Sequence, residues 1–185
     1  MDKKIIEEIK MACIQCIRYS GVMKREKHVS HTKDIRVLLH NIRSTYNVGS
    51  IFRTADAGGV KAIYFSGYTP TLYDNFGKKR TDIAKTALGA EESIHSEQVD
   101  PNTLITHLRA EGFQILALEQ SDDSVGYKDV KLKEKVLFIV GNEVRGISSS
   151  LRAKADTTIE IPMYGIKESL NVSVAFGIAL FEIIK

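Results

Sequence analysis

Three segments of the chain are rich in small and polar residues of the kinds that bind ligands or act on them: NIRSTYNVGSIFRTADAGGV, GNEVRGIS and PMYGIKESLN. Their notable side chains are the amides of Asn47 and Asn171, the guanidinium of Arg53, the carboxylate of Glu143 and the hydroxyl of Ser169. Such groups hydrogen-bond polar substrates, stabilise developing charge or assist proton transfer. No segment contains G-x-G-x-x-G or a P-loop lysine motif, which argues against a dinucleotide enzyme, a P-loop NTPase and the ordinary Rossmann type of methyltransferase.

The trio Ser169-Leu170-Asn171 precedes an apolar segment that runs to the end of the sequence. Between Asn171 and Ile184 only Asn171, Ser173 and Glu182 are polar, so we expect a helix that is buried nearly all round. The segment is too short to span a bilayer. Two alternatives remain open for Ser169 and Asn171: they cap a core helix, or they present polar groups to something bound at its positive end.

Short apolar runs alternate with helical patterns from residue 35 onward. Strands are expected at IRVLLHNI, KAIYFSG, FQILALE, KVLFIVG and TTIEIP, and helices at VGSIFRTADAGG, NTLITHLRAEG and the terminal segment. This alternation predicts an α/β fold, with a mainly parallel sheet and helices on both faces. Ligands bind beyond the carboxyl ends of the strands in such sheets, which is where the polar segments are expected to lie.

Composition indicates one domain with an appendage, since the 185 residues are 43% hydrophobic. The net charge is +3, but residues 1–36 hold nine Lys/Arg against five Asp/Glu, whereas residues 37–185 hold seventeen against eighteen. We therefore predict a basic N-terminal arm, residues 1–35, with a helix at about residues 3–18, and a main domain, residues 36–185. The arm is suited to steer a polyanion, although a solvated helix face explains the charge as well.

Cysteine content and hydropathy indicate the compartment. Cys13 and Cys16 form a lone C-x-x-C on the arm's predicted helix, with no second pair to complete a zinc site. Ordinary packing residues are the favoured interpretation. Nothing resembles a signal peptide or a membrane span, so a cytoplasmic protein is expected.

The polar segments, extended by their neighbours, resemble a known family. NIRSTYNVGSIFRTADAGGV, LFIVGNEVRGIS and IEIPMYGIKESLNVSVAFGIAL are similar, in this order, to the three motifs of the SpoU (TrmH-like) RNA 2′-O-ribose methyltransferases of the SPOUT superfamily. GYTP followed by KTALGAE resembles the family's connecting segment. The resemblance implies a C-terminal trefoil knot, S-adenosylmethionine as methyl donor, RNA as partner and a homodimer.

The resemblance also assigns roles to single residues. Arg53 is expected to act on the 2′-hydroxyl, but arginine stays protonated. A guanidinium is suited instead to bind the adjacent phosphate and stabilise the developing alkoxide, which leaves proton removal to the phosphate or to water. The residues implied in cofactor binding are Gly141, Ile161 and Leu170, with Leu118, Glu119 and Met163 as further candidates.

Four more residues are expected around the reacting groups. Asn47 would position Arg53 or the substrate, and Glu143 would fix the loop around the cofactor or hold Arg53 in place. Ser169 and Asn171 would turn toward the nucleotide. Apart from the resemblance, Asn47 is also a plausible helix N-cap and Glu143 a solvated loop acid.

Contacts with RNA are expected from residues at two places in the sequence. These are Asn41 and Arg43 at the start of the first motif, and the basic run Lys78, Lys79 and Arg80 in a predicted loop. Taken alone, such a basic run is more often ordinary surface.

The function expected is methylation of a ribose 2′-hydroxyl in transfer RNA or ribosomal RNA, a reaction that requires no metal. Transfer RNA is favoured, because a compact catalytic domain has little additional apparatus for reading a large RNA. Two alternatives remain: a catalytically inactive RNA-binding protein of the same fold, and a methyltransferase that acts on a small molecule.

Overall fold

The computed structural model describes residues 31–185. The predicted helix at residues 3–18 and the cysteines Cys13 and Cys16 lie outside the described residues. The strands of the described part are β1 (Asp34–His40), β2 (Ala62–Ser66), β3 (His95–Gln98), β4 (Gln114–Leu118), β5 (Val125–Gly126), β6 (Lys135–Val140) and β7 (Thr157–Glu160). The helices are α2 (Thr45–Ala57), α3 (Thr81–Ala87), α4 (Ala90–Ser93), α5 (Pro101–Ala110), α6 (Ser149–Arg152) and α7 (Val172–Ile183).

All seven strands form one sheet in the order β3-β2-β1-β6-β4-β7-β5, and every pairing is parallel. Leu39 of β1 lies opposite Phe65 of β2 and Val140 of β6. The predicted α/β class is confirmed. Because the strands are parallel, their carboxyl ends meet along one edge, from which the three polar segments leave.

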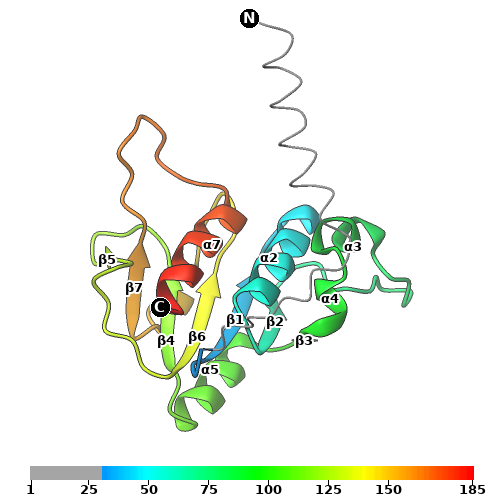
Figure 1. Cartoon of the computed structure of the whole chain (residues 1–185), viewed down its shortest axis with the longest axis horizontal. Coiled ribbons are helices and arrows are strands. Elements are labelled where there is room, and N and C mark those ends of the chain that lie inside the picture. The colour runs from blue at the N-terminus through cyan, green and yellow to red at the C-terminus, as the bar shows by residue number, and fades with distance from the viewer. Residues whose placement is uncertain (1–30) are drawn as a thin grey trace, which may run out of the picture. The chain divides into compact units, whose positions relative to one another are not determined.

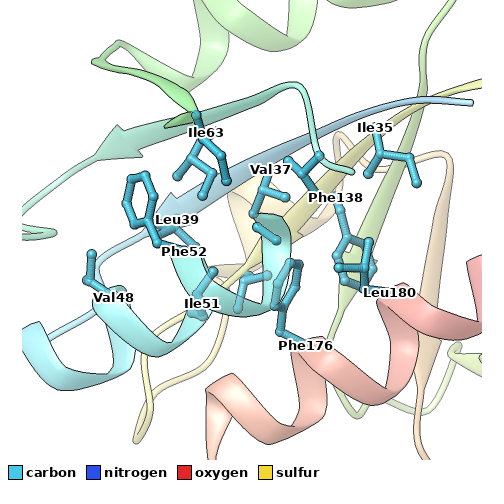
Figure 2. Packing of buried hydrophobic residues seen from close by; sticks show 14 of the residues in the cluster. Ile35, Val37, Leu39, Val48, Ile51, Phe52, Ile63, Phe138, Phe176 and Leu180 are labelled. Carbon is cyan, nitrogen blue, oxygen red and sulfur yellow. The ribbon is translucent and has the colours of Figure 1, made fainter. Parts of the chain in front are cut away.

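Helices cover both faces of the sheet, as predicted. Val37 and Leu39 of β1 belong to the apolar cluster beneath α2 and α7, whereas Leu38 belongs to the cluster beneath α5 and α6. This alternation follows from the two-residue period of a strand. Figure 2 shows Phe52 of α2 and Phe176 of α7 packed toward the same strands, and Figure 1 shows these two helices side by side.

We predicted that the terminal helix α7 is buried nearly all round. Within the single chain it is not, so this prediction is wrong for the single chain. Phe176, Leu180 and Ile183 are fully buried, but Val174 and Phe181 are 50% and 46% exposed. One hydrophobic face of α7 is therefore exposed to water in the single chain. This exposure bears on whether the protein forms an oligomer.

Several short elements were absent from the sequence prediction: α3, α4, α6, β3 and β5. The helices α4 and α6 have four residues each and β5 has two, so none shows a full hydrophobic period. β3 reads HSEQ and is held by pairing with β2 rather than by burial of apolar side chains. The trefoil knot and the division into arm and domain stay predictions. No helix within residues 31–185 is long and apolar enough to cross a membrane.

Candidate cofactor pocket and active site

A pocket of about 330 Å³ opens at the carboxyl edge of the sheet. It is formed by the segments that follow β4, β6 and β7 and by the start of α7. The six residues expected to bind the cofactor all line it: Leu118, Glu119, Gly141, Ile161, Met163 and Leu170. Residues from three parts of the sequence thus meet because parallel strands end at the same edge.

The floor of the pocket has no room for a side chain at Gly141. A Cβ atom there would lie 2.6 Å from backbone atoms of both Gly146 and Ile147. Gly146 itself has a φ of +64°, which favours glycine. Glu119 fastens this turn, because its Oε2 accepts a hydrogen bond of 2.7 Å from the backbone N–H of Ile147. Gly141 and Glu119 therefore shape the pocket as well as line it.

Glu143 joins the loop after β6 to the beginning of α2. Its Oε2 accepts from the N–H of Arg43 (2.9 Å), and its Oε1 accepts from the N–H of Ser44 (3.0 Å) and from Asn47 Nδ2 (2.8 Å). The alternative of a solvated loop acid is wrong. Burial disfavours the charged form, but the hydrogen bonds from Arg43, Asn47 and Ser44 outweigh it and lower the pKa of Glu143.

Asn47 extends this connection to α7. Helix α2 is capped by Ser44, whose Oγ accepts from the N–H of Asn47 (3.3 Å), so Asn47 is not the N-cap. The side-chain amide of Asn47 makes two hydrogen bonds: its Nδ2 donates to Glu143, and its Oδ1 accepts from Asn171 Nδ2 (3.1 Å). We call Glu143, Asn47 and Asn171 the amide network. It links the start of α2, the loop after β6 and the start of α7, which are distant in the sequence but adjacent in space.

Asn171 also caps α7, since its Oδ1 accepts from the N–H and the hydroxyl of Ser173 at 2.9 and 2.7 Å. Ser169 does not cap the helix. It lies exposed on the pocket wall, and no hydrogen bond of its side chain occurs within residues 31–185. Of these two residues, only Asn171 is a helix cap. The Ser169 hydroxyl is available to a bound molecule.

Arg53 makes no hydrogen bond or ion pair with the amide network in the described part of the chain. It lies exposed on α2, two turns after Asn47, and it is absent from the pocket wall. Among the described residues, no hydrogen bond or ion pair engages its guanidinium. The next residue, Thr54, packs against Gly177 of α7, so Arg53 stands beside the contact between α2 and α7.

Asn41 stabilises the turn after β1. It has a left-handed φ of +59°, its Oδ1 accepts from the N–H of Tyr68 (3.2 Å), and its Nδ2 donates to His40 Nε2 (2.9 Å). Burial lowers the pKa of His40, which favours the neutral ring that can accept this bond. Arg43, by contrast, keeps an exposed side chain and uses its backbone N–H on Glu143.

The basic run of Lys78, Lys79 and Arg80 lies in a loop, as predicted, but the three side chains differ in their exposure and in their contacts. Lys79 pairs with Glu92 and, at 3.1 Å, with Glu91, and these hydrogen bonds raise the pKa of Lys79. Arg80 precedes α3, and its Nε is buried. Lys78 is the exposed cation of the run.

Asn142 is a pocket residue that sequence reasoning missed. It is 6% exposed; its Nδ2 donates to the backbone oxygen of Asn41 (2.9 Å), and its Oδ1 accepts from the N–H groups of Val144 (2.9 Å) and Arg145 (2.7 Å). It thereby fixes the loop that carries Glu143. Its position one residue beyond the strand-like run KVLFIVG was an available signal. Within residues 31–185, His, Cys, Asp and Glu form no group of three suited to hold a metal ion.

The fold and the pocket define an α/β protein that binds a ligand at the carboxyl edge of a parallel sheet. The model of the SpoU rRNA Methylase family matches residues 34–181. The chain belongs to this family.

Individual relatives agree with the family match. The chain is 36% identical over 159 residues to the tRNA (guanosine(18)-2′-O)-methyltransferase of Aquifex aeolicus, a match that covers 85% of this chain and 72% of the relative. The enzyme of the same name from Escherichia coli K12 is 33% identical over 153 residues, with 80% and 62% covered.

Solved structures are similar as well. The A. aeolicus TrmH/SpoU tRNA modifying enzyme superposes with a TM-score of 0.71 at 34% identity, covering 83% of this chain and 76% of that one. An AdoMet-bound rRNA methyltransferase from Sinorhizobium meliloti gives a TM-score of 0.73 at 30% identity, with 83% and 57% covered.

Proposed function

We propose that this chain methylates a ribose 2′-hydroxyl of a transfer RNA, with the methyl donor in the pocket at the carboxyl edge of the sheet. Methylation of an RNA ribose with S-adenosylmethionine is the activity of this chain as a member of its family. The observation that carries the site assignment is the meeting of all six expected cofactor residues on one pocket wall. Transfer RNA is supported by the names of the relatives that match most of the chain.

The residues of the pocket fit S-adenosylmethionine. Leu118, Ile161 and Leu170 offer apolar surface for an adenosine group, and Glu160 and Glu168 offer carboxylates for a ligand with cationic groups. When bound, S-adenosylmethionine supplies an activated methyl group, so the protein must mainly orient the hydroxyl and assist loss of its proton. Gly141 supports this fit, because only a residue without a side chain lets the turn at Gly146 and Ile147 lie directly against the strand end at the pocket.

The amide network is proposed to hold the reacting groups in place. Asn47 and Asn171 bind each other across the starts of α2 and α7, and Glu143 fixes Asn47. Ser169 lies two residues before Asn171 and has a hydroxyl available to hydrogen-bond the nucleotide. We assign Arg53 to the RNA rather than to the cofactor, since it lies off the pocket wall. Arg43 and Lys78 are suited to phosphate contacts, whereas Asn41 has a structural role in the turn.

The test of this proposal is a titration with S-adenosylmethionine, followed by methyl transfer to total RNA from a strain that lacks the gene. Mapping the modified nucleotide then identifies the substrate, which we expect to be a transfer RNA in the cytoplasm. Cofactor binding without transfer to any RNA would contradict catalysis and favour an inactive RNA-binding protein. Transfer to ribosomal RNA alone would contradict the substrate.

We also propose a homodimer that covers the exposed face of α7. Val174, Ile178 and Phe181 are spaced so that they share one side of the helix, and their exposure leaves apolar surface that favours a second copy. Ile178→Asp should convert a dimer into a monomer in light scattering at micromolar concentration. Val125→Asp, at another exposed apolar position, is the control and should leave the mass unchanged. A wild-type monomer with full activity would contradict the dimer.

A further inference from the structure

A hairpin leaves the sheet after β2 and lies beside α3 and α4 (Figure 1). We call residues 72–80 the aromatic hairpin. Tyr73 pairs antiparallel with Lys79, and the N–H of Arg80 donates to the oxygen of Leu72 (2.9 Å). Leu72 packs on the apolar core, and Lys79 pairs with Glu91 of α4. The base of the hairpin is therefore held by both apolar and charged contacts.

The tip of the hairpin is fixed by Asp74. Its Oδ1 accepts from the N–H of Phe76 and from the N–H of Lys78, both at 2.9 Å. The N–H of Gly77 donates to the backbone oxygen of Asp74 (2.9 Å), and Gly77 has the positive φ of +76° that this turn requires. These hydrogen bonds fix the backbone on either side of Phe76, and they therefore fix the direction in which its side chain leaves the backbone.

Phe76 stands at this tip with 95% of its surface exposed. No aromatic or cation–π contact engages its ring within residues 31–185. Tyr73, 55% exposed, and Lys78, also exposed, belong to the same hairpin. A single exposed apolar residue is unremarkable on a surface. Here the ring is presented on a pinned turn next to a cation, and this combination matches the stacking platforms that bind single-stranded nucleic acid.

We propose that the aromatic hairpin binds the RNA substrate, with Phe76 stacked on an unpaired base and Lys78 at an adjacent phosphate. This inference rests on the proposed RNA substrate. In the sheet, β1 separates β2 from β6, so the hairpin and the pocket leave the carboxyl edge at different places. The stacked base is therefore a different nucleotide from the one that is methylated. Because stacking requires an unpaired base, the hairpin contributes to the choice of RNA.

The sequence offers a direct probe, because it contains no tryptophan. Phe76→Trp places a unique indole at the tip, and a single-stranded oligoadenylate should quench its fluorescence. A fully paired RNA duplex of equal length should quench it much less. Ala110→Trp, exposed at the end of α5, is the matched control and should respond weakly to both RNAs. Equal quenching of Phe76→Trp by duplex and single strand would overturn stacking.

The matching loss-of-function variant is Phe76→Ala. It should weaken binding of single-stranded RNA about tenfold, in the range known for loss of one stacked base, while Phe76→Tyr stays near wild type. S-adenosylmethionine affinity should be unchanged in both. Unchanged RNA affinity in Phe76→Ala overturns the inference, and so does a changed light-scattering mass without an RNA effect, because the ring would then contact a second copy. Methyl transfer by wild type, measured alongside, tests the proposed function separately.

Discussion

Replacing Arg53 with alanine should abolish methyl transfer to RNA while S-adenosylmethionine still binds. The guanidinium is exposed on α2, has no partner within the described residues and is absent from the pocket wall, so the cofactor does not depend on it. Its proposed contacts are the phosphate and the developing alkoxide of the RNA. Loss of one well-placed charged stabiliser typically costs on the order of a hundredfold or more in rate.

Two further variants separate chemistry from binding. Arg53→Lys should also fail, because an ammonium cannot reproduce the planar, two-pronged geometry of a guanidinium. Leu170→Asp should show the reverse pattern, since it places a charge on the proposed cofactor wall and should remove S-adenosylmethionine binding first. Calorimetric titration with the cofactor and single-turnover transfer to RNA measure the two effects, after thermal melts establish that each variant is folded. Near-normal turnover by folded Arg53→Ala at saturating RNA would make the catalytic assignment wrong.

Local patterns in the sequence were sufficient to predict the central part of the fold. The runs IRVLLHNI, KAIYFSG and KVLFIVG became β1, β2 and β6, because continuous apolar runs suit strands buried on both faces. The strand HSEQ carries no such pattern, and only its pairing with β2 defines it. The apolar sequence of α7 indicated that the helix needs cover on every side, but it did not indicate which face the chain itself leaves exposed, since that depends on packing against α2 and the sheet.

Motif resemblance selected several residues that the structure brings to one edge of the sheet, although Arg53 lies off the pocket wall, but it could not predict their contacts. Motif resemblance named Glu143, Asn47 and Asn171, and the polar segments placed them near one edge of the sheet. Their hydrogen bonds depend on side-chain geometry across segments distant in sequence, and these contacts changed the interpretation of Glu143 and of Asn47. Asn142 was missed for the same reason, because its role consists of contacts across loops.

Glu143 is the residue whose loss should disturb the site most broadly. Its carboxylate accepts from the N–H groups of Arg43 and Ser44 and from the Asn47 amide, so it serves both the start of α2 and the amide network. In Glu143→Gln, one oxygen becomes an NH₂ group that faces donors, and at least one hydrogen bond is replaced by a repulsive contact. We expect a loss of about 1–2 kcal/mol in unfolding free energy at pH 7, because a partly buried donor is left unpaired. Methyl transfer should fall as Asn47 and Asn171 lose their support.

The stability effect of Glu143→Gln should also depend on pH in a defined direction. Because folding lowers the pKa of Glu143, the unfolded chain binds more protons between the two pKa values, and stability falls as pH falls through that window. The contribution is complete above the pKa of an unfolded glutamate, about 4.3. Urea unfolding should therefore show a constant difference between wild type and Glu143→Gln from pH 6 to 8 and a smaller one below about pH 4. Glu168→Gln removes a carboxylate from the same pocket wall, at an exposed position without a hydrogen bond within residues 31–185, and should show no such difference. If the two variants behave alike, general charge rather than the hydrogen bonds of Glu143 at the start of α2 explains the effect, and the amide network loses its proposed anchor.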